Sequence, residues 1–577
     1  MKKTGAWLAV HALEQLPISY TFGIPGVHNT ELYDRLNSSK KIEPVLVTHE
    51  LGAAFMADAV SRTSDKIGTL VVVPAAGLTH AMSGIGEAFL DGIPMLVISG
   101  GVRRDIDVSF QLHEMDQQKL MQAVTKAQFS IKEHSEIVPF IFKAFNIAVS
   151  GEPGPVYVEI PVDIQLFKGE VKNLPGYQPI EDETRIDEAQ ISRAVELLKN
   201  AATPGLFLGW GCRACKDIAI ELAEILEAPV STTLQGIGVF PGDHPLHTGM
   251  GFSQAAVPAA ENAFKDCDCL LAVGTRFSEI PTGSFGCKVP ENLIHVDINP
   301  EVFNKNYPAK VQIEGDAKTV LLAILEKLKG DNFKTERKNI TLRDHIKRDK
   351  EAYYDEWRKH KKKKVNPFLF FEALHKNLKE DAIILVDDGN HTYLVVELFP
   401  VKKEQRCYCP TDFNSMGYCV PAAIGAKLAN PNSQVIGIVG DGAFLMTGME
   451  TLTASHRRLG IAYFVFHDGE LSQIAQSQEI PYNRKTCTIL GKFDLEGMAI
   501  ACRAEYFEIS RNKDIGEVIP KALEISSKGK PVIVDVNIDY SKRTRFTQGV
   551  VKTVLKRFPF RDKARFIGRA LLRKVIG

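Results

Sequence analysis

Short apolar segments alternate with amphipathic ones along most of this chain, and this alternation limits the folds open to it. In the first 170 residues, "IGTLVVVPAAG" and "IPMLVISGG" enclose "LTHAMSGIGEAFL", which has the length of a helix. The pattern returns around "CLLAVGTRF" and "LIHVDINP", and again around "AIILVDDGNHT" and "VIGIVGDG". Apolar strands separated by helices predict βαβ units with parallel pairing. We therefore expect an α/β protein of three doubly wound parallel-sheet domains.

The 577 residues are too many for one hydrophobic core, and the pattern divides them into three domains. We predict an N-terminal domain over 1–171, a central domain over 188–330 and a C-terminal domain over 367–545. A polar, proline-containing stretch near 172–188 predicts a linker. The charged run 331–366 predicts a solvated helix and linker, and residues 546–577 form a basic tail.

Composition excludes several function classes. A hydrophobic content of 45%, a charged content of 24% and a formal net charge of zero are typical of a soluble globular protein and give no case for a nucleic-acid partner. His11 and Glu14 interrupt the first apolar run, which favours an amphipathic helix over a secretion signal. No uncharged apolar run reaches the roughly 18 residues of a membrane span. Ten cysteines then predict reduced thiols and a cytoplasmic location, and the single CxxC of Cys212 and Cys215 favours buried thiols over a zinc site.

One stretch of the third domain carries the strongest chemical signal. In "VIGIVGDGAFLMTGMETL", Asp441 stands between Gly440 and Gly442, where an apolar strand ends and a helix begins. Glycines let the backbone approach a phosphate closely, and a helix N-terminus offers free N–H groups and the positive end of a dipole. The alternative is a structural turn that needs Gly440, Asp441 and Gly442 for its backbone conformation and binds no ligand.

A second acidic residue follows the next strand. Asp468 in "IAYFVFHDGE" lies 27 positions after Asp441, about one helix plus one strand, so both side chains are expected beside the same helix N-terminus. Two carboxylates and a backbone carbonyl suit Mg²⁺, with phosphate oxygens and water completing an octahedron. The pair therefore favours a metal-held diphosphate over a simple turn.

These residues resemble the cofactor fingerprint of thiamine diphosphate enzymes, in which a GDG is followed one helix and one strand later by an asparagine pair. Here His467-Asp468 replaces the pair, a variant similar to that of some catabolic acetolactate synthases. The resemblance implies Mg²⁺ ligands at Asp441, Asp468 and the backbone carbonyl of Glu470. It also implies cofactor contacts along one short stretch, namely Gly440, Asp441, Gly442, Ala443 and Phe444.

A second region resembles the same family. "VTHELGAAFMADAVSR" is similar to the stretch whose glutamate contacts the aminopyrimidine ring of the cofactor, and that glutamate is here Glu50. A carboxyl group at that ring favours the imino tautomer and lets the cofactor deprotonate its own thiazolium carbon. A helix-capping or surface glutamate is the alternative. "YTFGIPGVHNTELYDRL" resembles another first-domain stretch of this family and adds Gly26 as a cofactor contact.

The third domain supplies further pocket residues by resemblance. "DDGNHT" is similar to the loop that meets the diphosphate, which implies contacts from Gly389, Asn390 and His391. "DFNSMGYCVPAAIGAKLA" resembles the stretch that holds the aminopyrimidine. It has Asn414 in place of a usual glycine and would set Met416 beneath the bent cofactor. Simple core packing is the alternative for this methionine.

Two further stretches bear on the substrate and on a second cofactor. "SFQLHEMDQQ" resembles a loop near the substrate in the acetolactate synthase branch, which implies Gln111 as a catalytic residue and adds His113 as a candidate for proton transfer. A structural histidine is the alternative. The central domain resembles one that binds FAD in part of that branch. Its stretch 249–254 departs from the FAD-binding pattern, so FAD is an optional cofactor.

The resemblance spans roughly residues 5–540 and implies a thiamine diphosphate and Mg²⁺ enzyme similar to acetolactate synthase. Such an enzyme decarboxylates a 2-oxo acid, here expected to be pyruvate, and joins the product to an acceptor carbonyl. Two alternatives stay open: a C–C lyase of acyl-CoA substrates, similar to 2-hydroxyacyl-CoA lyase or oxalyl-CoA decarboxylase, and a non-catalytic binding protein. In this family Glu50 and Asp441 would face each other across subunits, which implies a homodimer at least, and homotetramers are frequent.

The tail departs from the family pattern. From Val550 onward it carries nine Lys/Arg residues and one Asp, with Phe566, Ala570, Leu571 and Val575 at helical spacing. A basic amphipathic helix of this kind predicts peripheral contact with an anionic membrane or with a partner protein. Packing over the protein's own active site is the alternative.

Overall fold

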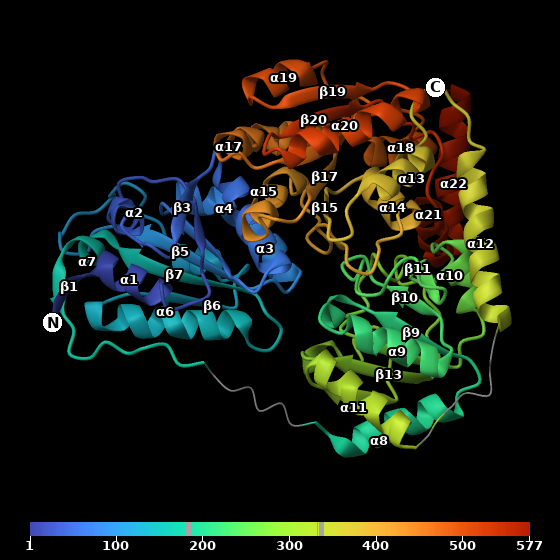
Figure 1. The fold of residues 1–577 in the computed structure, drawn as a ribbon, viewed down its shortest axis with the longest axis horizontal. Coiled ribbons are helices and arrows are strands. Elements are labelled where there is room, and N and C mark those ends of the chain that lie inside the picture. Colours follow the sequence, from blue (N-terminus) through green and yellow to red (C-terminus); the bar gives the residue numbers. More distant parts are fainter. Residues whose placement is uncertain (180–185, 332, 334–339, 577) are drawn as a thin grey trace.

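The chain folds into three lobes that follow one another along the sequence (Figure 1). The structure is a computed structural model, and it describes residues 1–179, 186–331, 333 and 340–576. Each lobe contains one six-stranded sheet, and all strand pairs within these sheets are parallel. Helices cover the sheets on both sides, so the predicted fold of three doubly wound domains is confirmed.

In the N-terminal sheet, β2 (Tyr20–Gly23) is the first strand along the chain, and it lies inside the sheet and not at an edge. The strand order is β3 (Glu43–Leu46), β2, β4 (Gly68–Val72), β5 (Met95–Gly101), β7 (Pro155–Pro161) and β6 (Ala127–Ser130). The helices are α1 (Gly5–Leu13), α2 (Thr30–Asn37), α3 (Glu50–Thr63), α4 (Ala76–Leu90), α5 (Gln117–Met121), α6 (His134–Val149) and α7 (Val162–Leu166). A short antiparallel ribbon of β1 (Lys2–Thr4) and β8 (Lys168–Glu170) closes the domain. The crossovers reverse direction between β2 and β4, which is where open α/β sheets bind ligands.

The C-terminal domain repeats this topology strand for strand. Its order is β16 (Arg406–Tyr408), β15 (Ile383–Val386), β17 (Val435–Gly440), β18 (Ile461–Phe466), β20 (Val532–Val536) and β19 (Glu505–Ile509). The helices are α13 (Pro367–Asn377), α14 (Asn390–Leu398), α15 (Cys419–Ala429), α16 (Asp441–Thr447), α17 (Thr451–His456), α18 (Ser472–Tyr482), α19 (Leu495–Ala501) and α20 (Ile515–Ser527), with a 3₁₀ turn η3 (Gly448–Glu450) after α16. The equivalent reversal lies between β15 and β17.

The central domain has a different strand order. Its strands run β11 (His247–Met250), β10 (Val230–Thr232), β9 (Pro204–Leu208), β12 (Cys269–Val273), β13 (Asn292–Asp297) and β14 (Val311–Glu314). The helices are α8 (Glu188–Asn200), α9 (Lys216–Leu226), α10 (Pro258–Ala263) and α11 (Ala317–Gly330). This is the order of a dinucleotide-binding sheet, with the reversal between β9 and β12.

Sequence explains why the central strands of each sheet are buried on both faces. Strand β18 reads "IAYFVF", and every one of its side chains is buried. A strand covered by helices on both faces has no solvated side, so apolar residues run continuously along it and do not alternate with polar ones.

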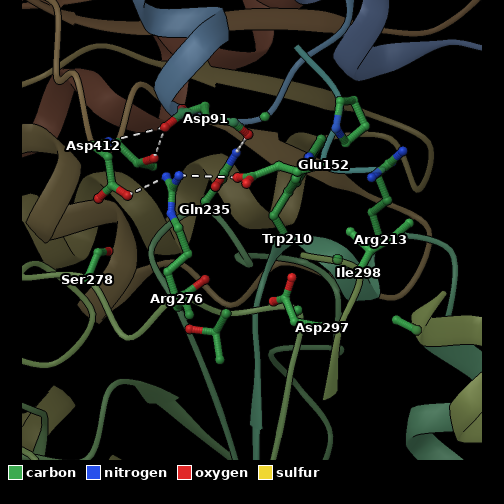
Figure 2. Close-up of a pocket in the computed structure, with 18 of the residues that line it drawn as sticks. Asp91, Glu152, Trp210, Arg213, Gln235, Arg276, Ser278, Asp297, Ile298 and Asp412 are labelled. Carbon is green, nitrogen blue, oxygen red and sulfur yellow. Dashed lines mark hydrogen bonds and ion pairs between the residues drawn. The ribbon is translucent and has the colours of Figure 1, made fainter. Parts of the chain in front are cut away.

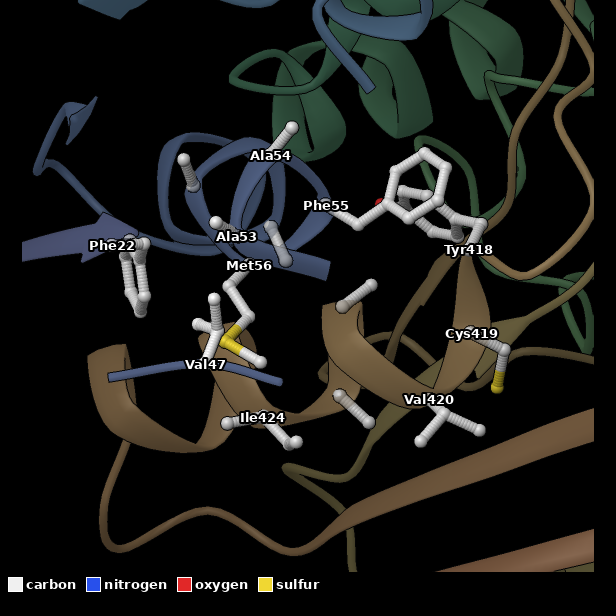
Figure 3. Close-up of a cluster of buried hydrophobic side chains, with 14 of the residues drawn as sticks. Phe22, Val47, Ala53, Ala54, Phe55, Met56, Tyr418, Cys419, Val420 and Ile424 are labelled. Carbon is white, nitrogen blue, oxygen red and sulfur yellow. The ribbon is translucent and has the colours of Figure 1, made fainter. Parts of the chain in front are cut away.

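Helices α3 and α15 join the first and third domains into one core (Figure 3). A Cβ atom on Gly425 would lie 2.2 Å from the carbonyl oxygen of Met56, so only glycine permits this approach of the two helices. Beside them the buried Arg62 guanidinium lies 2.6 Å from Asp58 and 2.8 Å from Asp91. Tyr418 donates its hydroxyl to Asp58 at 2.9 Å, which ties α15 to this charged cluster.

The charged segment predicted over 331–366 is described without gaps from 340 onward, and that part is packed, not fully solvated. It contains helix α12 (Ile340–Arg358), and the side chains of Ile346, Tyr353 and Trp357 on that helix are buried. The chain ends in two further helices, α21 (Arg545–Arg557) and α22 (Phe560–Ile576). Among the described residues no helix is both long and apolar enough to cross a lipid bilayer.

Candidate active site

The ends of strands β17 and β18 are joined through Asp441. This residue begins α16 directly after β17, and its side chain is almost fully buried. Its Oδ2 atom accepts the backbone N–H groups of Asp468 at 3.1 Å and Gly469 at 2.7 Å, while Oδ1 accepts that of Gly442 at 2.8 Å. The two aspartates predicted to meet beside one helix N-terminus are therefore neighbours in space.

Asp441 is buried, and Asp468 is half-buried beside it. Burial raises the pKa of Asp441, and burial together with the nearby Asp441 charge raises the pKa of Asp468 to about 6. Asp468 also accepts a hydrogen bond from the Ser472 hydroxyl. The His467 ring lies between two carboxylates, with its Nδ1 3.1 Å from Asp535 and its Nε2 4.0 Å from Asp441, and the hydrogen bond to Asp535 raises its pKa. Two desolvated acidic groups side by side form a donor set that a hard divalent cation would satisfy.

At Glu470 the side chain is occupied, whereas the backbone carbonyl is free for a ligand. Its carboxylate binds the Lys485 ammonium at 2.8 and 2.6 Å. Its carbonyl oxygen accepts no hydrogen bond from the described residues and so has a free lone pair. No group of three or more His, Cys, Asp or Glu side chains suited to a metal occurs in the described part of the chain. A cation here would therefore need phosphate and water oxygens beside the protein ligands.

Several buried polar atoms around these aspartates have no protein partner. His391 Nε2 and Asn390 Nδ2 at the start of α14 are two of them. The His391 ring lies where Cβ atoms would stand on Gly389 and Gly440, at 2.7 and 3.0 Å from its Cε1. Burial lowers the pKa of His391 to about 3, so the ring is neutral. Since unpaired buried polar groups are costly, these atoms fit a polar ligand held between them.

Two more residues with unpaired atoms were not predicted from the sequence. Gln473 Oε1 and the hydroxyl of Tyr540 are buried without a partner, and the charges of Asp468 and Asp441 act on Tyr540. Neither residue belongs to a motif. The signal that could have found them is their position, because each follows the carboxyl end of a strand, β18 or β20.

The loop of Asn414 and Met416 is fastened to the end of β15. Asp387 accepts the N–H groups of Gly417 at 2.9 Å and Cys419 at 2.8 Å. Asn414 has a φ of 61°, a left-handed conformation that asparagine tolerates better than most residues. This explains how it replaces a glycine. The methyl carbon of Met416 would be 3.7 Å from a Cβ on Gly442, so its side chain lies over the strand end.

Glu50 lies at the carboxyl edge of the N-terminal sheet. It begins α3, is 7% exposed, and its Oε2 is 3.0 Å from His80 Nδ1. The backbone N–H groups of Thr48 and His49 donate to Glu450 of the C-terminal domain at 3.0 and 3.1 Å. Neither His80 nor Glu450 was predicted as a site residue. His80 lies on α4 and Glu450 in the turn η3, and Glu450 gave no sequence signal.

Three other predicted residues lie on loops of the first domain. The Gly26 N–H donates to Asn29 at 2.7 Å, and a Cβ there would lie 2.5 Å from Val73 Cγ1. The side-chain amide of Gln111 donates a hydrogen bond to the Arg103 carbonyl of the same loop at 2.8 Å. The His113 ring packs at 5.1 Å against the His28 ring, where the loop after β2 begins.

The predicted residues therefore form two groups. One gathers at the ends of β15, β17 and β18 and comprises Gly389, Asn390, His391, Asn414, Met416, Gly440, Asp441, Gly442, Ala443, Phe444, Asp468 and Glu470. The other lies at the carboxyl edge of the N-terminal sheet and comprises Gly26, Glu50, Gln111 and His113. Among the described residues no hydrogen bond or ion pair joins Glu50 to Asp441.

Three family models match the chain domain by domain. They are the N-terminal TPP binding domain over 3–120, the central domain over 191–324 and the C-terminal TPP binding domain over 387–536 of thiamine pyrophosphate enzymes. The chain belongs to the thiamine pyrophosphate enzyme family. Thiamine pyrophosphate is the same compound as thiamine diphosphate, so the predicted family is confirmed.

Curated members of the family resemble this chain over most of its length. The acetolactate synthase large subunit of Corynebacterium glutamicum is 32% identical, covering 92% of this chain and 86% of the relative. A probable acetolactate synthase large subunit of Methanocaldococcus jannaschii is 32% identical over 93% and 92%. The acetolactate synthase isozyme 2 large subunit of Escherichia coli is 30% identical over 93% and 95%.

A cavity of about 450 Å³ lies between the three domains of this thiamine pyrophosphate enzyme (Figure 2). Arg276, after β12, bridges Glu152 of the first domain at 3.2 Å and Asp412 of the third at 2.7 Å. Asp297 ends β13, and burial raises its pKa to about 6. Part of the lining comes from the reversal point between β9 and β12, where Gly211 and Gly274 pack backbone against backbone. A cavity at such a reversal point is where this type of sheet binds a dinucleotide.

Proposed function

We propose that this chain is a thiamine diphosphate- and Mg²⁺-dependent enzyme of the acetolactate synthase type. It would decarboxylate a 2-oxo acid, pyruvate in the first instance, and join the product to an acceptor carbonyl. The observation that carries the proposal is the pair Asp441 and Asp468, held side by side and desolvated next to the unpaired atoms of Asn390 and His391. The names of the relatives support the same reaction type.

The cofactor would be held mainly by the C-terminal domain. Mg²⁺ would take the carboxylates of Asp441 and Asp468 and the free carbonyl of Glu470. The diphosphate would take the N–H groups at the start of α16 and the unpaired amide group of Asn390, an uncharged donor, with the neutral His391 ring beside it. When bound, thiamine diphosphate supplies the nucleophilic carbon and the electron sink that decarboxylation needs.

Glu50 would hold a proton for the aminopyrimidine. Its carboxyl group is buried, one oxygen is hydrogen bonded to His80, and its loop is anchored by Glu450. A buried, anchored carboxyl keeps one geometry and exchanges little with solvent. Asp387 in turn fixes the loop of Asn414 and Met416. These groups position the reactants and limit access of water.

The two halves of the site would be completed by a second copy of the chain. Large apolar side chains beside both halves are exposed in one chain. In the first domain they include Phe110 at 99% and Leu112 at 65%, and after the Gly440 turn they include Met446 at 55% and Met449 at 47%. Exposed apolar patches of this kind mark protein interfaces. A homodimer is therefore the smallest assembly that we propose.

FAD is the second cofactor that we propose, in the cavity between the domains. Arg213 and Arg276 line this cavity, whereas the stretch 249–254 that departs from the FAD-binding pattern does not. Flavin absorbance and a flavin released on denaturation would support this assignment. All ten cysteines are free, including the buried Cys212 and Cys215, which supports a reducing, cytoplasmic location.

The reaction is tested by carbon dioxide release from the holoprotein. Pyruvate, a panel of other 2-oxo acids and oxalyl-CoA are compared by this release, and 2-hydroxyacyl-CoA is assayed by the aldehyde that its cleavage gives. We expect release with pyruvate and formation of acetolactate, and Glu50→Gln should slow turnover by a factor of about 100 or more, as expected for loss of a general acid–base. Turnover of only the acyl-CoA panel would favour the lyase, and no turnover with bound cofactor would contradict both enzymes.

A further inference from the structure

Helix α22 is held against the protein by one of its faces. Arg573 donates to the Pro481 carbonyl at 3.1 Å, and its guanidinium lies 5.1 Å from the ring centre of Tyr482. Asn483 donates to the Arg573 carbonyl at 3.2 Å. Phe566 and Ala570 are partly buried on the same side. The helix therefore packs on the C-terminal end of α18, and none of these contacts involves a residue predicted for the active site.

A second face of α22 is apolar and open. Phe560 is 87% exposed, Ile567 is 52% exposed and Leu571 is 60% exposed. These positions are seven and four residues apart, so they form one stripe along the helix. Leu572 beside the stripe is 60% exposed as well. In Figure 1 the helix lies at the outer edge of the C-terminal domain.

Basic side chains border the open stripe on both sides. Helical geometry sets Arg561 along one border and Lys574 along the other, with Arg565 further round the helix, while Lys563 donates to the Lys556 carbonyl at 2.9 Å. Asp562 is the one acidic residue from Val550 to the end of the chain, against nine basic ones. Since the whole chain has a formal net charge of zero, this positive charge is local to the tail.

The positive charge beside the stripe distinguishes two surfaces that could cover it, a second copy of the helix and a lipid bilayer. A second copy of the helix would bring one positive border against another, and the resulting repulsion opposes self-association. An anionic bilayer accepts both features, because apolar side chains enter the boundary between headgroups and acyl chains while lysine and arginine reach the lipid phosphates. The helix of 17 residues is roughly 25 Å long, which suits lying in the membrane plane.

We propose that α22 docks this protein on an anionic membrane surface through the stripe of Phe560, Ile567 and Leu571. The helix lies parallel to the membrane and keeps its contact with α18. The contact is peripheral, and it depends on the lipid charge and on the apolar stripe together. This docking is independent of the reaction proposed above.

Co-sedimentation of the full chain with lipid vesicles tests the proposal. Vesicles of phosphatidylcholine alone are compared with vesicles that contain phosphatidylglycerol. We expect at least tenfold tighter binding to the anionic vesicles, and a tenfold or greater loss in high salt because surface charges are screened. The double variant Ile567→Glu with Leu571→Glu should lose this binding at least tenfold. Equal binding to both kinds of vesicle would overturn the proposal.

Two controls separate docking from other effects. Ile500→Glu alters a 72% exposed isoleucine on α19 and should bind anionic vesicles as the unaltered protein does. Arg561→Gln with Arg565→Gln should weaken binding to anionic vesicles without touching the apolar stripe. The remaining explanation is that the stripe binds a second copy of the chain, and sedimentation velocity without lipid tests it. If the variant Ile567→Glu with Leu571→Glu forms a smaller assembly than the unaltered protein, the stripe serves self-association and membrane docking is overturned.

Discussion

Glu450 accepts the backbone N–H of His49 at 3.1 Å, so the C-terminal domain holds the residue directly before Glu50. The same oxygen accepts the N–H and the hydroxyl of Thr48 at 3.0 and 2.7 Å. The two halves of the candidate site are thus linked through a buried carboxylate of one domain and a backbone turn of the other.

Removing this carboxylate should disturb the position of Glu50. Glu450→Ala removes the acceptor of two backbone N–H groups in a part-buried contact, and we expect a loss of about 1 kcal/mol in the free energy of unfolding and at least tenfold slower turnover. Glu450→Gln keeps an acceptor oxygen and should restore most of the turnover. Urea unfolding and steady-state kinetics measure the two effects, and equal turnover of both variants would rule out this positioning role.

Gly440 should be needed for cofactor binding more than for folding. A Cβ there would lie 3.0 Å from His391 Cε1 and 3.3 Å from its Nδ1, so Gly440→Ala pushes the ring. Its φ of −76° is open to alanine, so the backbone is not strained. We expect at least tenfold weaker binding of thiamine diphosphate by calorimetry, with little change in stability. Gly491→Ala, which meets nothing within 4 Å, is the matched control and should bind normally.

Gly425 should be needed for folding. A methyl group there would meet the Met56 carbonyl at 2.2 Å, and backbone in the middle of α3 cannot move without separating the first and third domains. We expect Gly425→Ala to cost about 2 kcal/mol or more in unfolding free energy, as overpacking does. Gly516→Ala on α20 meets no atom within 4 Å and should be neutral or stabilising because alanine favours helix. A Gly425→Ala protein as stable as Gly516→Ala would contradict the packing argument.

Stability should fall with rising pH through Glu397. This buried carboxyl accepts the Arg545 and Phe546 N–H groups at the start of α21 and a hydrogen bond from the Tyr353 hydroxyl. Burial raises its pKa to about 7, above that of an unfolded glutamate near 4.3. A raised carboxyl pKa contributes stability below about pH 4 that is lost as pH rises to about 7.

The matched variant is Glu397→Gln, which cannot titrate. Compared with this variant, the unaltered protein should lose unfolding free energy on the order of 3 kcal/mol between pH 4.5 and pH 7. Denaturant unfolding at several pH values measures the difference. Parallel pH profiles for the two proteins would show that Glu397 does not hold its proton in the folded state.

The fold and the cofactor motifs could be predicted because they are local patterns. Strands such as "IAYFVF" signal burial by their own composition, and the spacing between Asp441 and Asp468 is that of one helical crossover, broken here into α16, η3 and α17, and one strand. The alternation of strands and helices is repeated in three domains, so it predicts three parallel sheets although it does not specify their strand order.

The remaining site residues depend on tertiary contacts that leave no local pattern. Glu450 meets Thr48 across about four hundred residues of chain, and Trp357 is buried although its helix reads as charged and solvated. Gln111 matched a substrate loop by resemblance, but its amide is occupied by the Arg103 carbonyl within the single chain. Contacts of this kind follow from the folded arrangement and not from spacing along the sequence.

Calorimetric titration of thiamine diphosphate into the protein, with Mg²⁺ and with a chelator, tests the central claim most directly. The paired carboxylates of Asp441 and Asp468 should make binding depend on the divalent ion, and Asp441→Asn should weaken it at least a hundredfold in the presence of Mg²⁺. Binding of equal strength with Mg²⁺ and with chelator, unchanged by Asp441→Asn, would contradict the account.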